Sequence, residues 1–87
     1  GDMIINEDSL ENWIRSNATT VWHPTSTCRM GTDKLSVVDK NLLVYGVNKL
    51  RVVDASIMPS ITTGNTAAPT IMIAEKASDI IKDTYVL

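Results

Sequence analysis

The sequence predicts a short mixed α/β chain, an α+β fragment in which central strands are followed by a long C-terminal helix. Three observations support this fold class. A helical stripe of apolar residues runs through 69–83, β-branched residues gather in 36–54, and two irregular stretches cover 19–35 and 55–65. A compact domain of 87 residues rarely needs two such irregular stretches. We therefore expect these loops to wrap around another segment or chain.

The first residues of the chain predict a tail followed by one short helix. Residues 1–8 read as an N-terminal tail or a cloning scar, because they lack the basic start and apolar run of a signal peptide. Asp8 or Ser9 can cap a helix over 9–18. The apolar face of this helix is formed by Leu10, Trp13 and Ile14.

The segment 9–35 continues from this helix into a loop that carries the one histidine of the chain. Within VWHPTSTCRMG, Pro24 forces His23 out of the α-helical region, so the segment is extended there. The tripeptide Asn17-Ala18-Thr19 matches an N-glycosylation acceptor. This pattern leans towards a secreted protein, although the localisation stays unknown.

The segment 36–87 opens with strand signals. SVVD predicts a short strand, and LLVYGVNKL contains the turn formers Gly46 and Asn48 between β-branched flanks. LRVVD has the pattern of a buried strand that ends at Asp54.

The same segment ends in the strongest helix signal, over 69–83. Proline is tolerated only in the first turn of a helix, so Pro69 places the helix start near Asn65 or Thr66. The predicted apolar stripe consists of Ile73, Ala77, Ile80 and Ile81, widened by Met72 and Ala74.

Charge, composition and missing motifs exclude several functions. The net charge of -2 offers no basic footprint for nucleic acid or an anionic membrane, and no apolar run reaches the length of a membrane span. A single cysteine, Cys28, excludes an internal disulfide, and one Cys with one His does not make a metal site. The chain has no G-x-G-x-x-G, P-loop or G-x-S-x-G motif, so it cannot hold a nucleotide by itself.

Few side chains of this sequence are candidates for catalysis or ligand binding. His23 can accept a proton, and an imidazole with an amide such as Asn65 can bind one hydroxyl group, although no spacing rule brings these two residues together. His23 can equally be structural. Asp54 either faces a ligand crevice or caps the turn that follows it. Arg29 and Arg51 are candidates for anion contacts.

Three blocks of the sequence follow one another along the chain: VWHPTSTCRMG, VVDKNLLVYGVNKLRVVDASIMP and TTGNTAAPTIMIAEKASDII. Together, over about residues 9–83, they resemble the C-terminal end of the glucose–methanol–choline (GMC) oxidoreductases, flavoenzymes related to choline dehydrogenase and aryl-alcohol oxidase. The resemblance implies that the strands and long helix complete a Rossmann-like FAD domain. Another segment or chain would supply the dinucleotide fingerprint.

The resemblance also implies roles for individual residues. His23 would take the substrate hydroxyl proton while hydride passes to FAD, and Asn65 would be the second catalytic position. The cofactor-binding residues would be Trp22, Asp54, Ala55, Thr66 and Ala67. A helix N-terminus at Thr66 would offer free N–H groups and a partial positive charge to the flavin ring.

The implied function is oxidation of a small alcohol by an FAD-dependent oxidase or dehydrogenase, with the chain inactive alone and partnered by the remaining N-terminal part of the enzyme. Two alternatives stay open. One is a hydroxynitrile lyase of the same fold, which binds FAD without net redox. The other is a non-enzymatic interaction domain, which would have to fold and stay soluble by itself.

Overall fold

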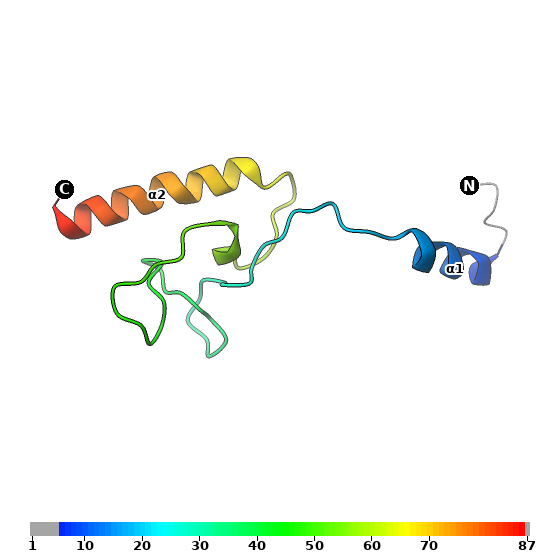
Figure 1. Ribbon diagram of the computed structural model, residues 1–87, viewed down its shortest axis with the longest axis horizontal. Coiled ribbons are helices and arrows are strands. Elements are labelled where there is room, and N and C mark those ends of the chain that lie inside the picture. Colours follow the sequence, from blue (N-terminus) through cyan, green and yellow to red (C-terminus); the bar gives the residue numbers. More distant parts are fainter. Residues whose placement is uncertain (1–5, 87) are drawn as a thin grey trace.

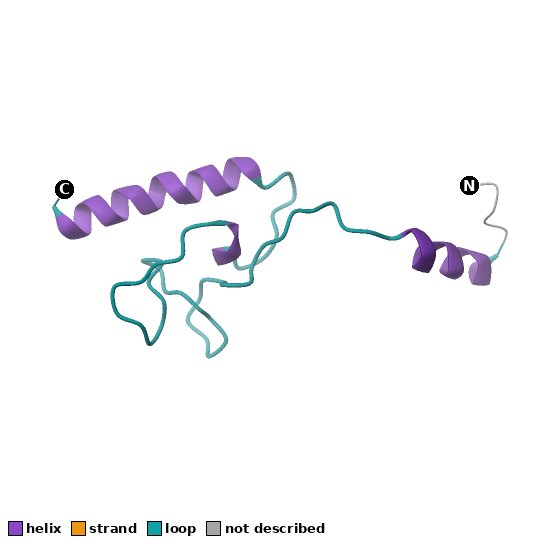
Figure 2. Ribbon diagram, in the orientation of Figure 1, coloured by secondary structure: helices purple, strands orange, loops and turns teal. Residues whose placement is uncertain are grey.

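The computed structural model describes residues 6–86, so residues 1–5 of the predicted tail lie outside the described residues. Figures 1 and 2 show helices joined by long irregular segments. The elements in chain order are α1 (Glu7–Asn17), the 3-10 helix η1 (Ala55–Ile57) and α2 (Ala67–Tyr85). Neither α-helix within 6–86 is long and apolar enough to cross a membrane.

The chain is extended rather than compact. Its principal extents are 64 × 28 × 15 Å and its radius of gyration is 19.0 Å, whereas a compact domain of this length has a radius of about 12 Å. Its accessible surface of 6998 Å² exceeds the value of about 5,000 Å² typical of a compact monomer of this mass. Figure 1 shows why: α1 lies at the end of an extended arm, away from the remaining elements.

Helix α1 begins two residues before the predicted start. Its N-cap is Asn6, whose Oδ1 accepts the Ser9 N–H at 2.9 Å while the Ser9 hydroxyl accepts the Asn6 N–H at 3.0 Å. The prediction of Asp8 or Ser9 as the cap was therefore wrong. Glu7 and Asp8 instead fill the first turn, where acidic side chains favour the helix dipole. No residue of α1 is buried.

A small apolar core lies between α2, η1 and the preceding loops. Its buried members are Val38, Leu42, Ile57, Met58, Ile73 and Ala77. The predicted stripe on α2 is confirmed at Ile73 and Ala77, and Ile80 and Ile81 are half-buried. Met72 and Ala74 are exposed, so the stripe is narrower than predicted. The core therefore fixes one face of α2 and leaves its other faces uncovered.

The predicted strands were wrong: within residues 6–86 the backbone forms only isolated bridges. These pair Met30 with Val38 in parallel, and Val38 with Val44 and Leu43 with Arg51 in antiparallel orientation. Left-handed backbone at Leu42 (φ 66°), Gly46 (φ 77°) and Lys49 (φ 61°) bends the chain before any ladder lengthens. The LRVVD segment, predicted as a buried strand, is half-buried over 51–53.

Backbone hydrogen bonds tie the loop after His23 to η1. The N–H groups of Ser26, Cys28 and Met30 donate in turn to the carbonyl oxygens of Ala55 at 3.4 Å, Ser56 at 2.9 Å and Ile57 at 2.8 Å. These bonds join two irregular segments that are distant in sequence. The position of the histidine loop is consequently fixed relative to η1.

Candidate active site

The imidazole of His23 is held by the backbone just before it. Its Nδ1 lies 2.5 Å from the carbonyl oxygen of Val21. A carbonyl oxygen only accepts hydrogen bonds, so Nδ1 is the donor, and in the neutral ring Nε2 is the nitrogen that carries the lone pair. The residue as a whole is half-buried. The geometry therefore presents His23 Nε2 as a proton acceptor.

His23 and Asn65 line the same open cavity, which has a volume of about 490 Å³. The full lining is Val21, His23, Ile61, Thr62, Thr63, Gly64 and Asn65. The Thr62 hydroxyl donates to the Gly64 carbonyl at 3.3 Å and holds the turn that leads to Asn65. The structure thus brings together the two residues that the sequence could not connect by spacing.

Trp22 does not line this cavity; Val21 does. The Trp22 residue is 80% exposed, and its backbone is left-handed with φ 60°. The sequence reasoning also missed Ile61, Thr62 and Thr63 as wall residues. Their place directly before Gly64 and Asn65 is the signal that could have identified them.

The N-terminus of α2 follows directly after Asn65. Thr66 occupies the N-cap position with helical dihedral angles and makes no side-chain capping bond. The N–H groups of Ala67 and Ala68 have no acceptor within residues 6–86, and both residues are exposed. Pro69 contributes no N–H. Free donors beside small side chains suit the hydrogen-bond acceptor edge of a planar group, so this end of α2 fits the flavin that the resemblance implies.

Asp54 is the N-cap of η1. Its Oδ1 accepts the Ser56 N–H at 2.7 Å and also the Ser56 hydroxyl. The Ser56 hydroxyl, helped by the Ser56 N–H, lowers the pKa of the exposed Asp54 carboxyl group. The capping alternative is therefore confirmed. Ala55, next to it, uses its carbonyl oxygen to accept N–H groups from Ser26 and Met58. Contact of either residue with FAD stays a prediction.

The candidate anion-binding arginines are both engaged within the chain. Arg29 donates to both oxygens of Asp33, at 2.9 and 2.7 Å, and this pairing lowers the pKa of Asp33 to about 2. Arg51 Nε donates to the Asn41 carbonyl at 3.1 Å, and its guanidinium lies 5.8 Å from the ring centre of Tyr85. Both therefore act in holding the fold together.

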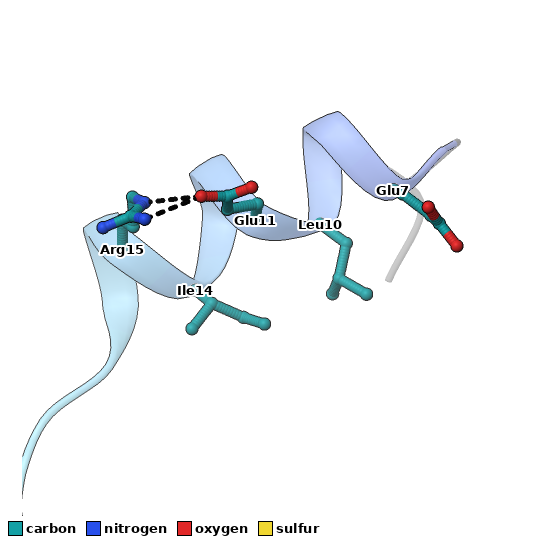
Figure 3. Close-up of a pocket in the computed structure, with 5 residues that line it drawn as sticks. All are labelled: Glu7, Leu10, Glu11, Ile14 and Arg15. Atoms are coloured by element: carbon teal, nitrogen blue, oxygen red, sulfur yellow. Dashed lines mark hydrogen bonds and ion pairs between the residues drawn. The ribbon is translucent and has the colours of Figure 1, made fainter.

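A separate hollow lies on α1 and is lined by residues of that helix alone (Figure 3). Leu10 and Ile14 point to the same side of the helix, and Arg15 pairs with Glu11 at 2.7 Å. Leu10 and Ile14 are 40% and 47% exposed. This hollow is one face of a helix that has no buried residue. Within the described residues, no group of three or more His, Cys, Asp or Glu side chains could hold a metal ion.

Comparison with known proteins gives the family. The C-terminal domain model of GMC oxidoreductase matches residues 2–74. The chain belongs to the GMC oxidoreductase family, and it is a C-terminal segment of that family's fold.

Named relatives support this assignment. An alcohol dehydrogenase [acceptor] of Pseudomonas putida is 56% identical over 81 residues, which are 93% of this chain and 15% of that protein. An oxygen-dependent choline dehydrogenase of Pseudomonas fluorescens (strain SBW25) is 57% identical over 76 residues, which are 87% of this chain and 13% of that protein. The crystal structure of pyridoxine 4-oxidase from Mesorbium loti aligns with a TM-score of 0.76 at 42% identity, covering 83% of this chain and 14% of that one.

The chain thus spans about one seventh of the length of the relatives it matches. This proportion agrees with the extended shape and the small core. Many large apolar side chains of this segment are exposed, as is usual for one piece of a larger fold.

Proposed function

We propose that this chain is the C-terminal portion of an FAD-dependent oxidoreductase that oxidises an alcohol, with His23 as the proton acceptor. The single observation that carries the proposal is the shared cavity. His23, with Nδ1 bound to Val21 and Nε2 free, lines the same open space as Asn65. Membership in a family whose named relatives include alcohol and choline dehydrogenases gives the reaction type.

In the proposed reaction, a substrate hydroxyl lies in the cavity between the two side chains. His23 Nε2 takes the hydroxyl proton, and the Asn65 amide hydrogen-bonds to the same oxygen and holds it in place. Bound FAD supplies the acceptor for the hydride that leaves the carbon. A positioned proton acceptor of this kind contributes about 10²–10⁴-fold to the rate.

The cofactor-facing residues offer donors and acceptors of suitable kinds. The N–H groups at Thr66 and Ala67 would stabilise negative charge at the flavin ring, because the N-terminal end of α2 carries the partial positive charge of the helix dipole. The ionised Asp54 carboxylate suits a ribityl hydroxyl, which can donate a hydrogen bond to it. A phosphate is less suitable, because a carboxylate and a phosphate both accept hydrogen bonds and neither donates one. The backbone of Ala55 would lie close to FAD, and the exposed Trp22 would lie at the edge of the flavin ring.

The rest of the enzyme would complete what this segment leaves open. It would supply the dinucleotide fingerprint, most of the substrate pocket and the partner strands against which the isolated bridges lengthen into a Rossmann-like sheet. The small-molecule alcohol would enter between that part and the His23 cavity.

The test uses the complete flavoenzyme that contains this segment, mixed anaerobically with primary alcohols. We expect the yellow flavin absorbance to bleach as aldehyde accumulates. A hydroxynitrile lyase would behave differently, because it would release cyanide from a cyanohydrin while the flavin absorbance stayed constant. Cyanide release without bleaching by any alcohol would overturn the proposal.

A further inference from the structure

The peptide unit between Val21 and Trp22 is held at both ends by side chains. Its carbonyl oxygen, on Val21, accepts the His23 Nδ1–H at 2.5 Å. Its N–H, on Trp22, donates to the Thr20 hydroxyl oxygen at 3.0 Å. A trans peptide is planar, with its C=O and N–H pointing in opposite directions. Fixing one end therefore fixes the direction of the other.

The conformation of this turn needs such support. Trp22 has φ 60°, in the left-handed region that a bulky side chain disfavours. Rotation of the Val21–Trp22 peptide would relieve this strain. The same rotation would swing the carbonyl oxygen away from His23 Nδ1, and the ring would then lose the contact that selects its tautomer and its direction.

We propose that Thr20 is a positioning residue for the catalytic histidine. Its hydroxyl holds the Trp22 N–H, and through that one peptide it holds the carbonyl that anchors the imidazole. The hydrogen bond from the Trp22 N–H to Thr20 also polarises the peptide, which makes the Val21 carbonyl a stronger acceptor for the His23 Nδ1–H. This inference rests on the proposed function of His23 and assigns Thr20 no contact with substrate or cofactor.

The experiment measures anaerobic flavin reduction by an alcohol in the complete enzyme. The Thr20→Val variant keeps the side-chain shape and removes the hydroxyl. We expect the limiting rate to fall about five- to tenfold, the scale of one net hydrogen bond, with the substrate dissociation constant unchanged. Thr20→Ser should restore the rate to within about twofold. Thr19→Val is the matched control, because the exposed Thr19 makes no hydrogen bond within residues 6–86, and its rate should equal that of the wild type.

Two further readouts separate positioning from general stability. In a His23→Ala background, Thr20→Val should change nothing more, because Thr20 acts only through the ring. In ¹⁵N spectra of histidine-labelled enzyme, the wild-type His23 signals should be those of the Nδ1–H tautomer, and Thr20→Val should shift them towards a mixture.

Each failure has its own meaning. If Thr20→Val reduces flavin at the wild-type rate, or keeps the wild-type ¹⁵N signals, while His23→Ala is slow, the Thr20 inference is wrong and the proposed function stands. An equal Thr20→Val effect in both backgrounds also overturns the inference. If His23→Ala itself reduces flavin at the wild-type rate, the proposed function is wrong.

Discussion

The arm, residues 7–21, and the packed part, residues 26–81, hold their conformations for different reasons. Every buried residue of the described chain lies in the packed part, and the arm has none. The packed part is joined by hydrogen bonds between segments distant in sequence, such as Met30 to Ile57. In the arm, the hydrogen bonds join residues no more than four positions apart.

This difference shows which features this chain determines alone. An isolated helix of 11 residues is marginal in water, so the capping box and the Glu11–Arg15 pair of α1 give only local support. Its half-exposed Leu10, Trp13 and Ile14 suit a surface on the remaining enzyme. Between the two regions lies His23, whose ring is anchored locally and whose loop is anchored by η1.

The core of the packed part is the place where one substitution should do most damage. Ala77 is 1% exposed, so Ala77→Asp would bury an unpaired charge and destabilise the docking of α2 by about 3 kcal/mol or more. The measurement is the urea concentration at which the complete enzyme releases flavin. Ala74→Asp, on the exposed side of the same helix, is the control. Equal losses for both variants would show that α2 does not pack as described.

Alanine substitutions at two glycines should differ in their effect on stability, and both effects should be smaller than that of Ala77→Asp. A Cβ at Gly31 would collide with the Ser36 hydroxyl oxygen, whereas a Cβ at Gly64 meets nothing within 4 Å. We expect Gly31→Ala to cost about 1 kcal/mol of stability, the lower end of the overpacking range, because the Ser36 hydroxyl can rotate away. Gly64→Ala should leave the same urea midpoint almost unchanged. Loss of stability at Gly64 with none at Gly31 would contradict the packing around the loop.

The two helix starts should respond differently to loss of their cap residue. Asn6→Ala removes a capping box and should cost α1 about 1 kcal/mol, because α1 has no core contacts to compensate. Thr66→Ala should leave α2 intact, since Thr66 makes no side-chain capping bond. Hydrogen exchange of the amides in each helix measures both effects. If Thr66→Ala accelerated amide exchange in α2 more than Asn6→Ala did in α1, the expected difference between the two helix starts would be contradicted.

The smallest effect should come from the Arg29–Asp33 pair. The pKa of Asp33 is about 2 in the folded chain, below its ordinary value of 3.8, chiefly because Arg29 donates to it. The stabilisation is therefore complete above pH 3.8 and is lost as the pH falls towards 2. Carboxyl ¹³C titration should show the Asp33 transition move back up in Arg29→Ala. An unchanged transition would mean that the pair does not form.

Local rules predicted the helices better than the strands. Pro69 and the spacing of Ile73 and Ala77 were enough to place α2 and its buried face. The strand prediction failed at LRVVD and its neighbours, where left-handed backbone at Leu42, Gly46 and Lys49 leaves only isolated bridges. The Asn6 cap was within reach of sequence rules, since Asn is a favoured N-cap residue.

The site was predicted by resemblance rather than by spacing. Nothing in the sequence alone joins His23 to Asn65, and only the folded loops bring both to one cavity. The left-handed backbone at Trp22 was also beyond sequence rules, because such a conformation in a bulky residue depends on hydrogen bonds from its surroundings. The Asp54 cap, in contrast, was one of the two alternatives that the sequence left open.

The central claim is that His23 accepts the substrate proton, and stopped-flow reduction of the flavin tests it most directly. In the complete enzyme, His23→Ala should reduce about 10²–10⁴-fold more slowly than the wild type with the same alcohol under anaerobic conditions. The flavin absorbance before mixing should match that of the wild type, which shows that the cofactor is in place. Reduction at the wild-type rate would contradict the account.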